Sequence, residues 1–365
     1  VGIMVTASHN PPQDNGYKVY LGGTVDGIYY RGSQIVSPTD EAIAAKIDAV
    51  TSLKSQPRGK VWEVLGEEII EKYITQTASL VSNPGALRIV YTAMHGVGTE
   101  TIQRVFHKAG FQSPILVEAQ AAPDPDFPTV AFPNPEEPGA IDLALETAKA
   151  FDAHLVIAND PDADRCAAAV KDPISGWRML RGDELGAIFA ESIARKIDSG
   201  IFANSIVSSS IVKKIADHYN LEFKETLTGF KWLAKIENLT FGYEEALGYS
   251  VDSATVNDKD GISAAITLAQ IATDLAAQGK TLLDLLDEIW QRHGFHATEQ
   301  ISIRLSDLSK VGIILGNLRS NPPQEIAGRS VTSIDDLATP TDGLPPTDGI
   351  RIWLDGGVRI IIRPS

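Results

Sequence analysis

Three aspartates at alternate positions form the most informative stretch of the sequence. Asp160, Asp162 and Asp164 lie in "NDPDADR" and follow directly on the apolar run "AHLVIA". A continuous apolar run is typical of a strand covered on both faces, so we expect the carboxylates at the carboxyl end of a strand, where ligands bind in open α/β sheets. Carboxylates this close repel one another unless a cation holds them, and all-oxygen ligands suit Mg²⁺ or Ca²⁺.

Two other interpretations of these aspartates have to be weighed. A calcium loop of the EF-hand type is excluded, because its sixth position would be Arg165 instead of glycine and its twelfth Lys171 instead of glutamate. An acidic surface turn with a salt-bridging arginine is as well supported by these residues alone as a metal site. If a metal binds here, a further ligand has to come from elsewhere, such as a phosphate oxygen.

A serine follows the apolar stretch Val1–Val5, which we expect to be a buried strand. Ser8 lies in "TASHNPP", and a serine hydroxyl is a weak nucleophile that needs a base or an electrophilic metal nearby. His9 and Lys18 are the local proton-transfer candidates, and the turn at "NG" would fold Lys18 back towards the serine. Taken alone, an ordinary loop is the favoured interpretation, since Asn-Pro and Pro-Pro are frequent in loops.

Two later segments contain polar side chains suited to a sugar phosphate. Glu244 stands in "GYEEALGY", where paired glutamates on a loop between glycines can accept strong hydrogen bonds from sugar hydroxyls. Lys259 stands in "NDKDG", where it could contact a phosphate or lie in the first turn of a helix. A solvated acidic turn is the default interpretation of the first segment in isolation.

The composition excludes several classes of protein. The 365 residues suggest about two to four domains. The formal net charge of −15 argues against nucleic acid or an anionic membrane as a partner, and no apolar run has membrane-spanning length. Cys166 is the only cysteine, so no internal disulfide can form, which fits a cytoplasmic location.

Apolar strands alternate with amphipathic helices through most of the chain, a pattern that predicts parallel βαβ units. We expect boundaries near Pro84, near Ser199-Gly200 and near Gly294. Beyond the last, "FHATEQISIRLS" and "GIRIWLDGGVRIIIRP" predict strands around a helix in a different, α+β module. Because the chain begins inside one apolar strand and stops just after another, we expect both ends to be cuts through a larger structure.

In this order, "TASHNPP", "NGYK", "DPDADR", "GYEEALGY" and "DKDG" resemble the motifs of the α-D-phosphohexomutases, the phosphoglucomutase/phosphomannomutase family. The resemblance covers nearly the whole chain. It implies three similar α/β domains with mixed or parallel sheets around a central cleft, followed by a smaller α+β domain, the first and last being incomplete here. The expected ranges are 1–83 for a phosphoserine domain, 84–198 for a metal-binding domain, 199–294 for a sugar-binding domain and 295–365 for a phosphate-binding domain.

The resemblance also implies roles for residues. Ser8 resembles the serine that carries the transferable phosphate and completes a site for one Mg²⁺, and a sugar bisphosphate is the expected activator. With His9 added from the local argument above, the expected catalytic residues are Ser8, His9, Lys18 and Arg165. The expected metal ligands are Ser8, Asp160, Asp162 and Asp164, and the expected substrate-binding residues are Thr228, Gly229, Glu244, Lys259, Arg363 and Ser365.

The implied function is an enzyme that moves a phosphate between the 1- and 6-positions of glucose or mannose through a phosphoserine and a sugar bisphosphate, with a phosphosugar as its small-molecule partner. A phosphopentomutase or a sugar-1,6-bisphosphate synthase is the alternative, and a non-catalytic sugar-phosphate-binding protein or a metal phosphatase is the alternative from another class. The sequence departs from the family at Pro161 and Ala163, where glycines are usual, and at Ala246, where many members have serine. The family's last phosphate loop also continues beyond the "RPS" at which this sequence stops.

Overall fold

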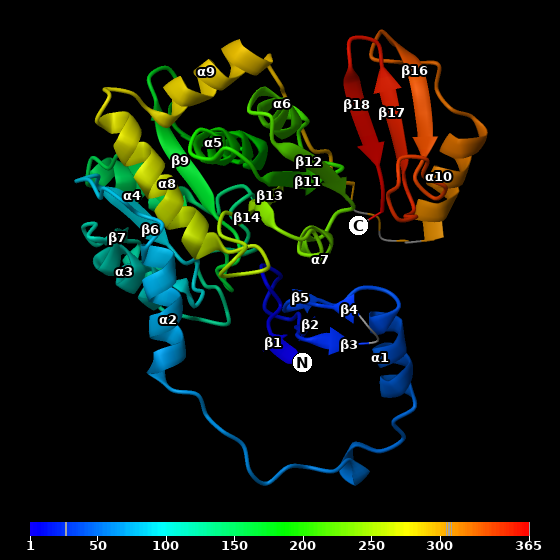
Figure 1. Cartoon of the computed structure of the whole chain (residues 1–365), viewed down its shortest axis with the longest axis horizontal. Helices are drawn as coiled ribbons and strands as arrows, with labels where there is room; N and C mark the ends of the chain where they lie inside the picture. Colours follow the sequence, from blue (N-terminus) through cyan, green and yellow to red (C-terminus); the bar gives the residue numbers. More distant parts are fainter. Residues whose placement is uncertain (26–27, 304, 306, 308, 365) are drawn as a thin grey trace. The chain divides into compact units, whose positions relative to one another are not determined.

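The computed structural model describes residues 1–25, 28–303, 305, 307 and 309–364. Its contacts divide the chain into two units, Val1–His296 and Ala297–Ser365 (Figure 1). In the described residues, no helix is both long enough and apolar enough to cross a membrane.

The first segment forms small antiparallel sheets. One sheet has the strand order β1-β2-β5 and consists of β1 (Gly2–Val5), β2 (Tyr17–Leu21) and β5 (Ser33–Gln34). The strands β3 (Thr24–Val25) and β4 (Ile28–Tyr29) pair with each other. The helix α1 (Thr39–Asp48) and the short 3-10 helix η1 (Leu53–Ser55) follow.

The prediction that Val1–Val5 is a buried strand is wrong. These residues do form β1, but Ile3 is 66% exposed and Val5 is 85% exposed. The physical reason is that, among the described strands, β1 pairs with β2 alone and lies at the edge of its sheet. An apolar strand is buried only where a second layer packs on it.

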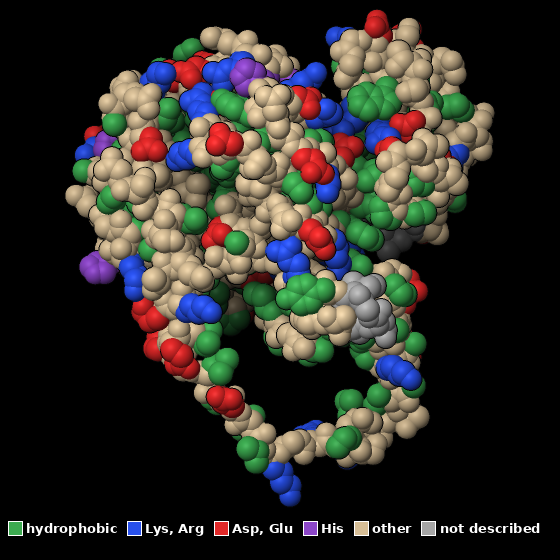
Figure 2. All heavy atoms as spheres, in the orientation of Figure 1, with side chains coloured by type: hydrophobic (Ala, Val, Ile, Leu, Met, Phe, Trp, Pro, Cys, Tyr) green, Lys and Arg blue, Asp and Glu red, His purple; other side chains and the backbone are tan. Residues whose placement is uncertain are grey.

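The segment 49–66 joins α1 to the rest of the first unit, and every one of its residues is exposed. Figure 2 shows this part of the chain as a strip one chain thick. The alternating strands and helices that the sequence predicts begin after this segment.

A five-stranded mixed sheet follows, with the order β10-β9-β8-β6-β7. Its strands are β6 (Ile89–Thr92), β7 (Ile115–Leu116), β8 (Leu155–Ala158), β9 (Ala167–Asp172) and β10 (Gly176–Met179). Its helices are α2 (Glu67–Ala78), α3 (Gly98–Ala109), η2 (Glu118–Gln120), α4 (Asp142–Ala150) and α5 (Gly182–Ala194). β6 runs parallel to β7 and β8, as the βαβ pattern predicts, whereas β9 and β10 are antiparallel additions.

A second mixed sheet has the order β12-β11-β13-β14. Its strands are β11 (Ile201–Ser205), β12 (Glu222–Thr226), β13 (Leu239–Glu244) and β14 (Gly248–Ser250). Its helices are α6 (Ile211–His218), α7 (Phe230–Leu233), α8 (Gly261–Ala276) and α9 (Leu282–His293). β11 runs parallel to both β12 and β13.

One continuous hydrophobic core joins these two sheets. It includes Ile157 of β8, Phe189 of α5 and Phe241 of β13, each completely buried. α8 contacts α2 and α3 beside the first sheet and β14 of the second, so this helix bridges the two halves (Figure 1). Because the core is shared, the loops at the ends of β8 and β13 are held in fixed positions relative to each other.

The described residues of the second unit form an antiparallel sheet and the helix α10 (Ser309–Ser320). Its strands are β15 (Glu325–Ile326), β16 (Arg329–Asp336), β17 (Ile350–Leu354) and β18 (Val358–Ile362). The predicted helix and the β17–β18 pair are present. The predicted strand in "FHATEQISIRLS" is wrong for the described residues 295–303, where Ile301 is 85% exposed and has no strand partner to pair with.

Candidate active site

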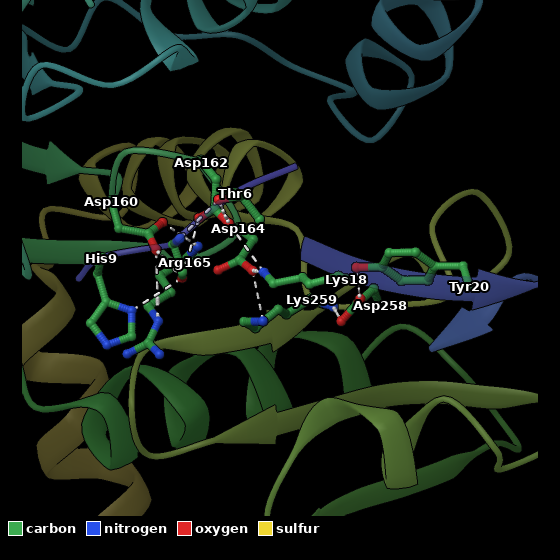
Figure 3. Close-up of polar contacts among 11 residues, drawn as sticks. Thr6, His9, Lys18, Tyr20, Asp160, Asp162, Asp164, Arg165, Asp258 and Lys259 are labelled. Atoms are coloured by element: carbon green, nitrogen blue, oxygen red, sulfur yellow. Dashed lines mark hydrogen bonds and ion pairs between the residues drawn. The ribbon is translucent and has the colours of Figure 1, made fainter. Parts of the chain in front are cut away.

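The three aspartates lie on a turn that follows β8 directly. Asp160 is completely buried, and its carbonyl oxygen accepts a hydrogen bond from the Ala163 N–H at 2.9 Å. Ala163 has a φ of +60°, in the left-handed region that favours glycine, at one of the positions where the sequence differs from the motif that it resembles. The turn brings one oxygen of each of Asp160, Asp162 and Asp164 within 4.8 Å of the others (Figure 3).

The turn is supported from below by buried polar contacts. The Asn159 side chain accepts a hydrogen bond from the Tyr91 hydroxyl at 2.8 Å and donates one to the Arg165 carbonyl at 2.6 Å. Gly261, the first residue of α8, lies so close to the same carbonyl that a Cβ atom there would collide with it. α8 therefore packs directly against the aspartate turn.

Ser8 lies beside this cluster, in the turn that follows β1. Its Oγ is 3.5 Å from Asp160 Oδ2, 3.5 Å from Asp162 Oδ1 and 3.1 Å from His9 Nδ1. Ser8 has a φ of +55°, and its N–H donates to the Thr6 hydroxyl oxygen at 2.8 Å. The Thr6 hydroxyl in turn donates to Asp162 Oδ2 at 3.0 Å, so the serine turn is anchored to the cluster at two points.

Two lysines from distant segments converge on Asp164. Lys18 Nζ donates to Asp164 Oδ2 at 2.6 Å and to Asp162 Oδ2 at 3.1 Å. Lys259 Nζ forms an ion pair with Asp164 Oδ2 at 2.7 Å. The hairpin turn does fold Lys18 of β2 back beside β1. The contacts of the Lys18 ammonium are with the carboxylates of Asp162 and Asp164 (Figure 3).

Glu244 is the last residue of β13 and Glu245 follows it, and the two carboxylates have different surroundings. Glu244 Oε1 accepts the Gly229 N–H at 2.5 Å, which brings the loop before α7 to this carboxylate. Glu245 Oε2 instead accepts hydrogen bonds from Ser208 at 2.8 Å and Ser205 at 3.2 Å. The serines fix Glu245 in the fold, and Glu244 is the member of the pair that is better placed for a ligand.

Backbone contacts join this glutamate turn to the aspartate turn. The Cys166 N–H donates to the Leu247 carbonyl at 3.0 Å, and Arg165 forms an isolated β-bridge with Gly248. The Arg165 N–H donates to Asp160 Oδ1 at 3.0 Å, and its Nε lies 3.7 Å from Asp160 Oδ2. The structure therefore brings the aspartate turn, Arg165 and the glutamate turn together, although β8 and β13 belong to different sheets.

Burial and neighbouring charges shift the pKa values of these groups in opposite directions. Burial, with Asp164 and Asp162 nearby, raises the pKa of Asp160 well above its usual value. Burial also opposes ionisation of Asp164, but the Lys259 and Lys18 ammonium groups outweigh it and lower the pKa of Asp164 to about 2. Burial, aided by Arg165, lowers the pKa of His9 to about 4.

The aspartate cluster fits a hard divalent cation. All of its ligand atoms are oxygens, and Asp164 Oδ1 is buried with no hydrogen-bond partner in the described part of the chain. A buried carboxylate oxygen without a partner is costly unless something binds it. Carboxylates with a phosphate oxygen form a common ligand set for Mg²⁺.

Two of the remaining predicted residues lie in the loop before α7, and two lie in the second unit. Gly229 reaches Glu244, and Thr228 is half-buried beside it in the same loop. Arg363 is exposed in the second unit, where its guanidinium donates to the Pro364 carbonyl at 3.1 Å. Ser365 lies outside the described residues.

The sequence analysis does not indicate three residues that hold the site in place: Thr6, Tyr20 and Tyr73. For Thr6 a signal exists, because a hydroxyl two residues before Ser8 is a typical partner for the Ser8 N–H. Tyr20 lies two positions after Lys18 on β2 and therefore on the same face of the strand, and this spacing is the signal that could have indicated it.

Comparison with known proteins identifies the family. Its models match in three consecutive parts: phosphoglucomutase/phosphomannomutase α/β/α domain I at residues 1–54, domain II at 70–176 and domain III at 181–293. A probable phosphomannomutase of Haemophilus influenzae is 48% identical over 370 residues, covering 100% of this chain and 74% of that protein. The chain spans 60% of a mouse phosphopentomutase, at 34% identity, and 49% of a yeast (Saccharomyces cerevisiae) phosphoribomutase, at 40% identity.

Solved structures share the fold. A phosphoglucomutase/phosphomannomutase family protein of Burkholderia thailandensis has a TM-score of 0.69 at 19% identity, covering 98% of this chain and 70% of that one. The phosphoglucomutase parafusin of Paramecium has a TM-score of 0.69 at 20% identity, covering 100% and 70%. The predicted architecture of three α/β domains and a C-terminal sheet domain is confirmed, and the chain belongs to the phosphoglucomutase/phosphomannomutase family.

Proposed function

We propose that this protein is a phosphosugar mutase that moves a phosphate between the 1- and 6-positions of glucose or mannose. The observation that carries the proposal is the position of Ser8 Oγ, 3.5 Å from carboxylate oxygens of both Asp160 and Asp162. A phosphate on that oxygen would lie at the cluster and supply the ligand that the three aspartates lack. The similarity to named mutases supports the same reaction class.

In the proposed site, Asp160, Asp162, Asp164 and an oxygen of phospho-Ser8 would hold one Mg²⁺. The cation would supply positive charge that stabilises the transferring phosphoryl group. Arg165, whose guanidinium lies beside Asp160, adds a fixed positive charge next to Ser8.

The proposed reaction has two transfers that balance. In the first, the bond between phosphorus and Ser8 Oγ breaks, a bond between phosphorus and the sugar hydroxyl oxygen forms, and the hydroxyl proton ends on Ser8 Oγ. In the second, the other phosphoryl group of the sugar bisphosphate moves to Ser8 Oγ and the proton returns to the sugar. His9 Nδ1, 3.1 Å from Ser8 Oγ, exchanges the proton at that oxygen. Lys18 exchanges the proton at the sugar hydroxyl.

Binding of the sugar is assigned to the loop before α7 and the turn after β13. Glu244 accepts hydrogen bonds from sugar hydroxyls, and Thr228 and Gly229 lie beside it. Lys259 binds a phosphate, since its ammonium is aimed at the aspartate cluster. Arg363 and Ser365 stay predicted ligands of the phosphate that is not reacting.

The test follows the phosphate and the isomer in one experiment. We expect the purified protein with Mg²⁺ to convert glucose 1-phosphate and mannose 1-phosphate into the 6-phosphates, and intact-mass spectrometry to show a phosphate that phosphatase removes. Ser8→Ala should abolish both signals, whereas Ser52→Ala, an exposed serine, should keep both. Full isomerisation by Ser8→Ala would overturn the mechanism. Release of free phosphate without isomer would identify a phosphatase, and binding without turnover a sugar-phosphate-binding protein.

A pentose phosphate is the second candidate substrate. The residue after the glutamate pair is Ala246, which cannot donate the hydroxyl hydrogen bond of the serine that many members carry, and phosphoribomutases and phosphopentomutases are among the relatives. Rates on ribose 1-phosphate measured beside the two hexose 1-phosphates decide the question. A clear preference for ribose 1-phosphate would replace the hexose assignment. Production of the bisphosphate from a separate phosphoryl donor would indicate a bisphosphate synthase.

The activator and the location belong to the same proposal. Added glucose 1,6-bisphosphate should shorten any lag in turnover, because it phosphorylates Ser8 in molecules that have lost the group. The buried, unpaired thiol of Cys166 fits a reducing cytoplasm, and fractionation of cells with an antibody to the protein tests that location.

A further inference from the structure

Lys259 stands between two aspartates, and each of them binds a tyrosine from another part of the chain. Its side chain is 14% exposed and forms an ion pair with Asp164 Oδ2 at 2.7 Å. A lysine side chain has four flexible carbons, so its own backbone attachment does not fix where the ammonium lies. The surroundings of Asp258 and Asp260 show what holds this segment in place.

The first contact comes from β2. The Tyr20 hydroxyl donates to Asp258 Oδ2 at 3.0 Å, and Asp258 Oδ1 accepts the backbone N–H of Lys259 at 2.8 Å (Figure 3). The two oxygens of one carboxylate therefore join the tyrosine ring to the peptide that carries Lys259. Burial and the neighbouring Asp258 raise the pKa of Tyr20 above its usual value, which keeps the hydroxyl protonated as a donor.

The second contact comes from α2. The Tyr73 hydroxyl lies 2.9 Å from both Asp260 Oδ1 and Asp260 Oδ2. Asp260 is the residue before α8, and its Oδ1 accepts the Ile262 N–H at 3.1 Å, so the same carboxylate caps the helix. Tyr73 thereby fixes the start of α8 on the other side of Lys259.

β2 also carries the other lysine of the site. Lys18 and Tyr20 are two positions apart on β2, so their side chains leave the same face of the strand. Lys18 reaches Asp164 directly, and Tyr20 reaches the segment that brings Lys259 to the same carboxylate oxygen. One strand thus sets the positions of both ammonium groups.

We propose that Tyr20 and Tyr73 are positioning residues: the Tyr20–Asp258 and Tyr73–Asp260 pairs fix the peptide of Lys259 so that its ammonium stays on the aspartate cluster. The effect of this arrangement on turnover rests on the proposed function, in which Lys259 binds a phosphate. The fixed place of Lys259 is independent of any activity. A ligand group displaced by about 1 Å can cost on the order of 100-fold in rate.

The first test measures the position of Lys259 without a substrate. The protein is treated briefly with an amine-acetylating reagent, and modification of each lysine is quantified by peptide mass spectrometry. We expect Tyr20→Phe and Tyr73→Phe to raise acetylation of Lys259 severalfold. Tyr17→Phe, at an exposed residue of the same strand, should match the wild type. Acetylation of Lys259 at the wild-type rate in both variants would overturn the proposal.

A second variant guards against a trivial loss of folding. Asp258→Ala removes the carboxylate that the Tyr20 hydroxyl binds and should expose Lys259 to the same extent as Tyr20→Phe. The double variant, Tyr20→Phe with Asp258→Ala, should show no more labelling of Lys259 than either single change. Exposed Lys224 reports the general reactivity of each sample, so a rise at Lys259 alone supports the proposal. A purely additive rise in the double variant would contradict it.

The third test uses turnover and separates a positioning role from a structural one. We expect Tyr20→Phe to raise KM for the phosphosugar about tenfold with a smaller change in kcat. In a Lys259→Ala background the same change should have no further effect on kcat/KM, whereas a general structural role would lower it in both backgrounds. An inactive wild-type protein would refute the proposed function, and the labelling result would still decide the inference.

Discussion

Lys18 and Asp164 are 146 positions apart in the chain, yet the Lys18 ammonium lies 2.6 Å from Asp164 Oδ2. The pair joins the hairpin that presents Ser8 to the turn that presents the aspartates. Lys18 is 17% exposed and Asp164 13%, so the pair is shielded from most of the solvent and interacts more strongly than a surface ion pair. It fixes the place of the serine relative to the carboxylates.

We expect Lys18→Met to lower the mutase rate by about 10²- to 10⁴-fold, the usual range for loss of a proton-transfer group. Binding of Mg²⁺ should be unchanged or tighter, because a positive charge leaves the cluster. Turnover assays and a Mg²⁺ titration of the same sample separate the two effects. Lys46→Met, on the exposed face of α1, is the matched control and should keep full activity. A variant that loses Mg²⁺ together with its rate would show that Lys18 supports the metal and not the proton transfer.

Ala163 gives a prediction about stability. Its φ of +60° disfavours any residue with a Cβ atom, so Ala163→Gly should stabilise the protein by about 0.5–1 kcal/mol after the greater freedom of glycine in the unfolded chain is counted. Denaturant unfolding measures the difference. Ala45→Gly, in the helix α1, is the opposite control and should cost about 0.5–1 kcal/mol. A loss of stability in Ala163→Gly would mean that packing of the methyl group stabilises the protein by more than the backbone strain at this position costs.

The part of the site that could be predicted follows from strands and their ends. "LVIA" is apolar throughout and forms β8, which is buried at all four positions, so we expect the aspartates after it at the carboxyl end of that strand. Glu244 follows from the same argument at the end of β13. Both predictions use only the local pattern and the rule that ligands bind at the carboxyl ends of strands in open α/β sheets.

The part that could not be predicted depends on contacts between distant segments. Thr6 binds a carboxylate 156 positions away and Tyr20 one 238 positions away, and no local pattern contains such pairings. The exposed strand Val1–Val5 also shows that burial depends on contacts with other segments. An apolar sequence predicts a strand, but only the elements packed against it decide whether that strand is buried.

Metal binding should be visible as thermal stabilisation. A ligand that binds only the folded protein adds about 2.7 kcal/mol at a concentration 100 times its Kd, so we expect Mg²⁺ to raise the Tm and a chelator to reverse the rise along with activity. Asp160→Asn should lose the Mg²⁺-dependent part of the Tm. Asp152→Asn, whose carboxylate is 77% exposed, should keep it. An equal Mg²⁺ response in both variants would place the metal elsewhere.

Glu244 gives the last prediction, a dependence of stability on pH. Its burial, only partly offset by the Gly229 N–H, raises the pKa of this carboxyl above its usual value. The folded protein therefore holds this proton more tightly than the unfolded chain. The contribution of Glu244 to stability is greatest below the unfolded-state pKa and is lost as the pH rises through the folded-state pKa. Glu244→Gln should raise the Tm of the ligand-free protein at pH 7 to 8 and make no difference near pH 4.

The same substitution should weaken the enzyme, because a neutral amide accepts weaker hydrogen bonds than a carboxylate. Loss of one charged hydrogen bond corresponds to about a 10- to 100-fold fall in kcat/KM. Glu237→Gln is a control glutamate outside the site and should leave the Tm difference and the kinetics at the wild-type values. A Glu244→Gln protein that is both less stable at pH 8 and fully active would show that this carboxylate is a structural acceptor for Gly229, and the sugar would then be held by other groups.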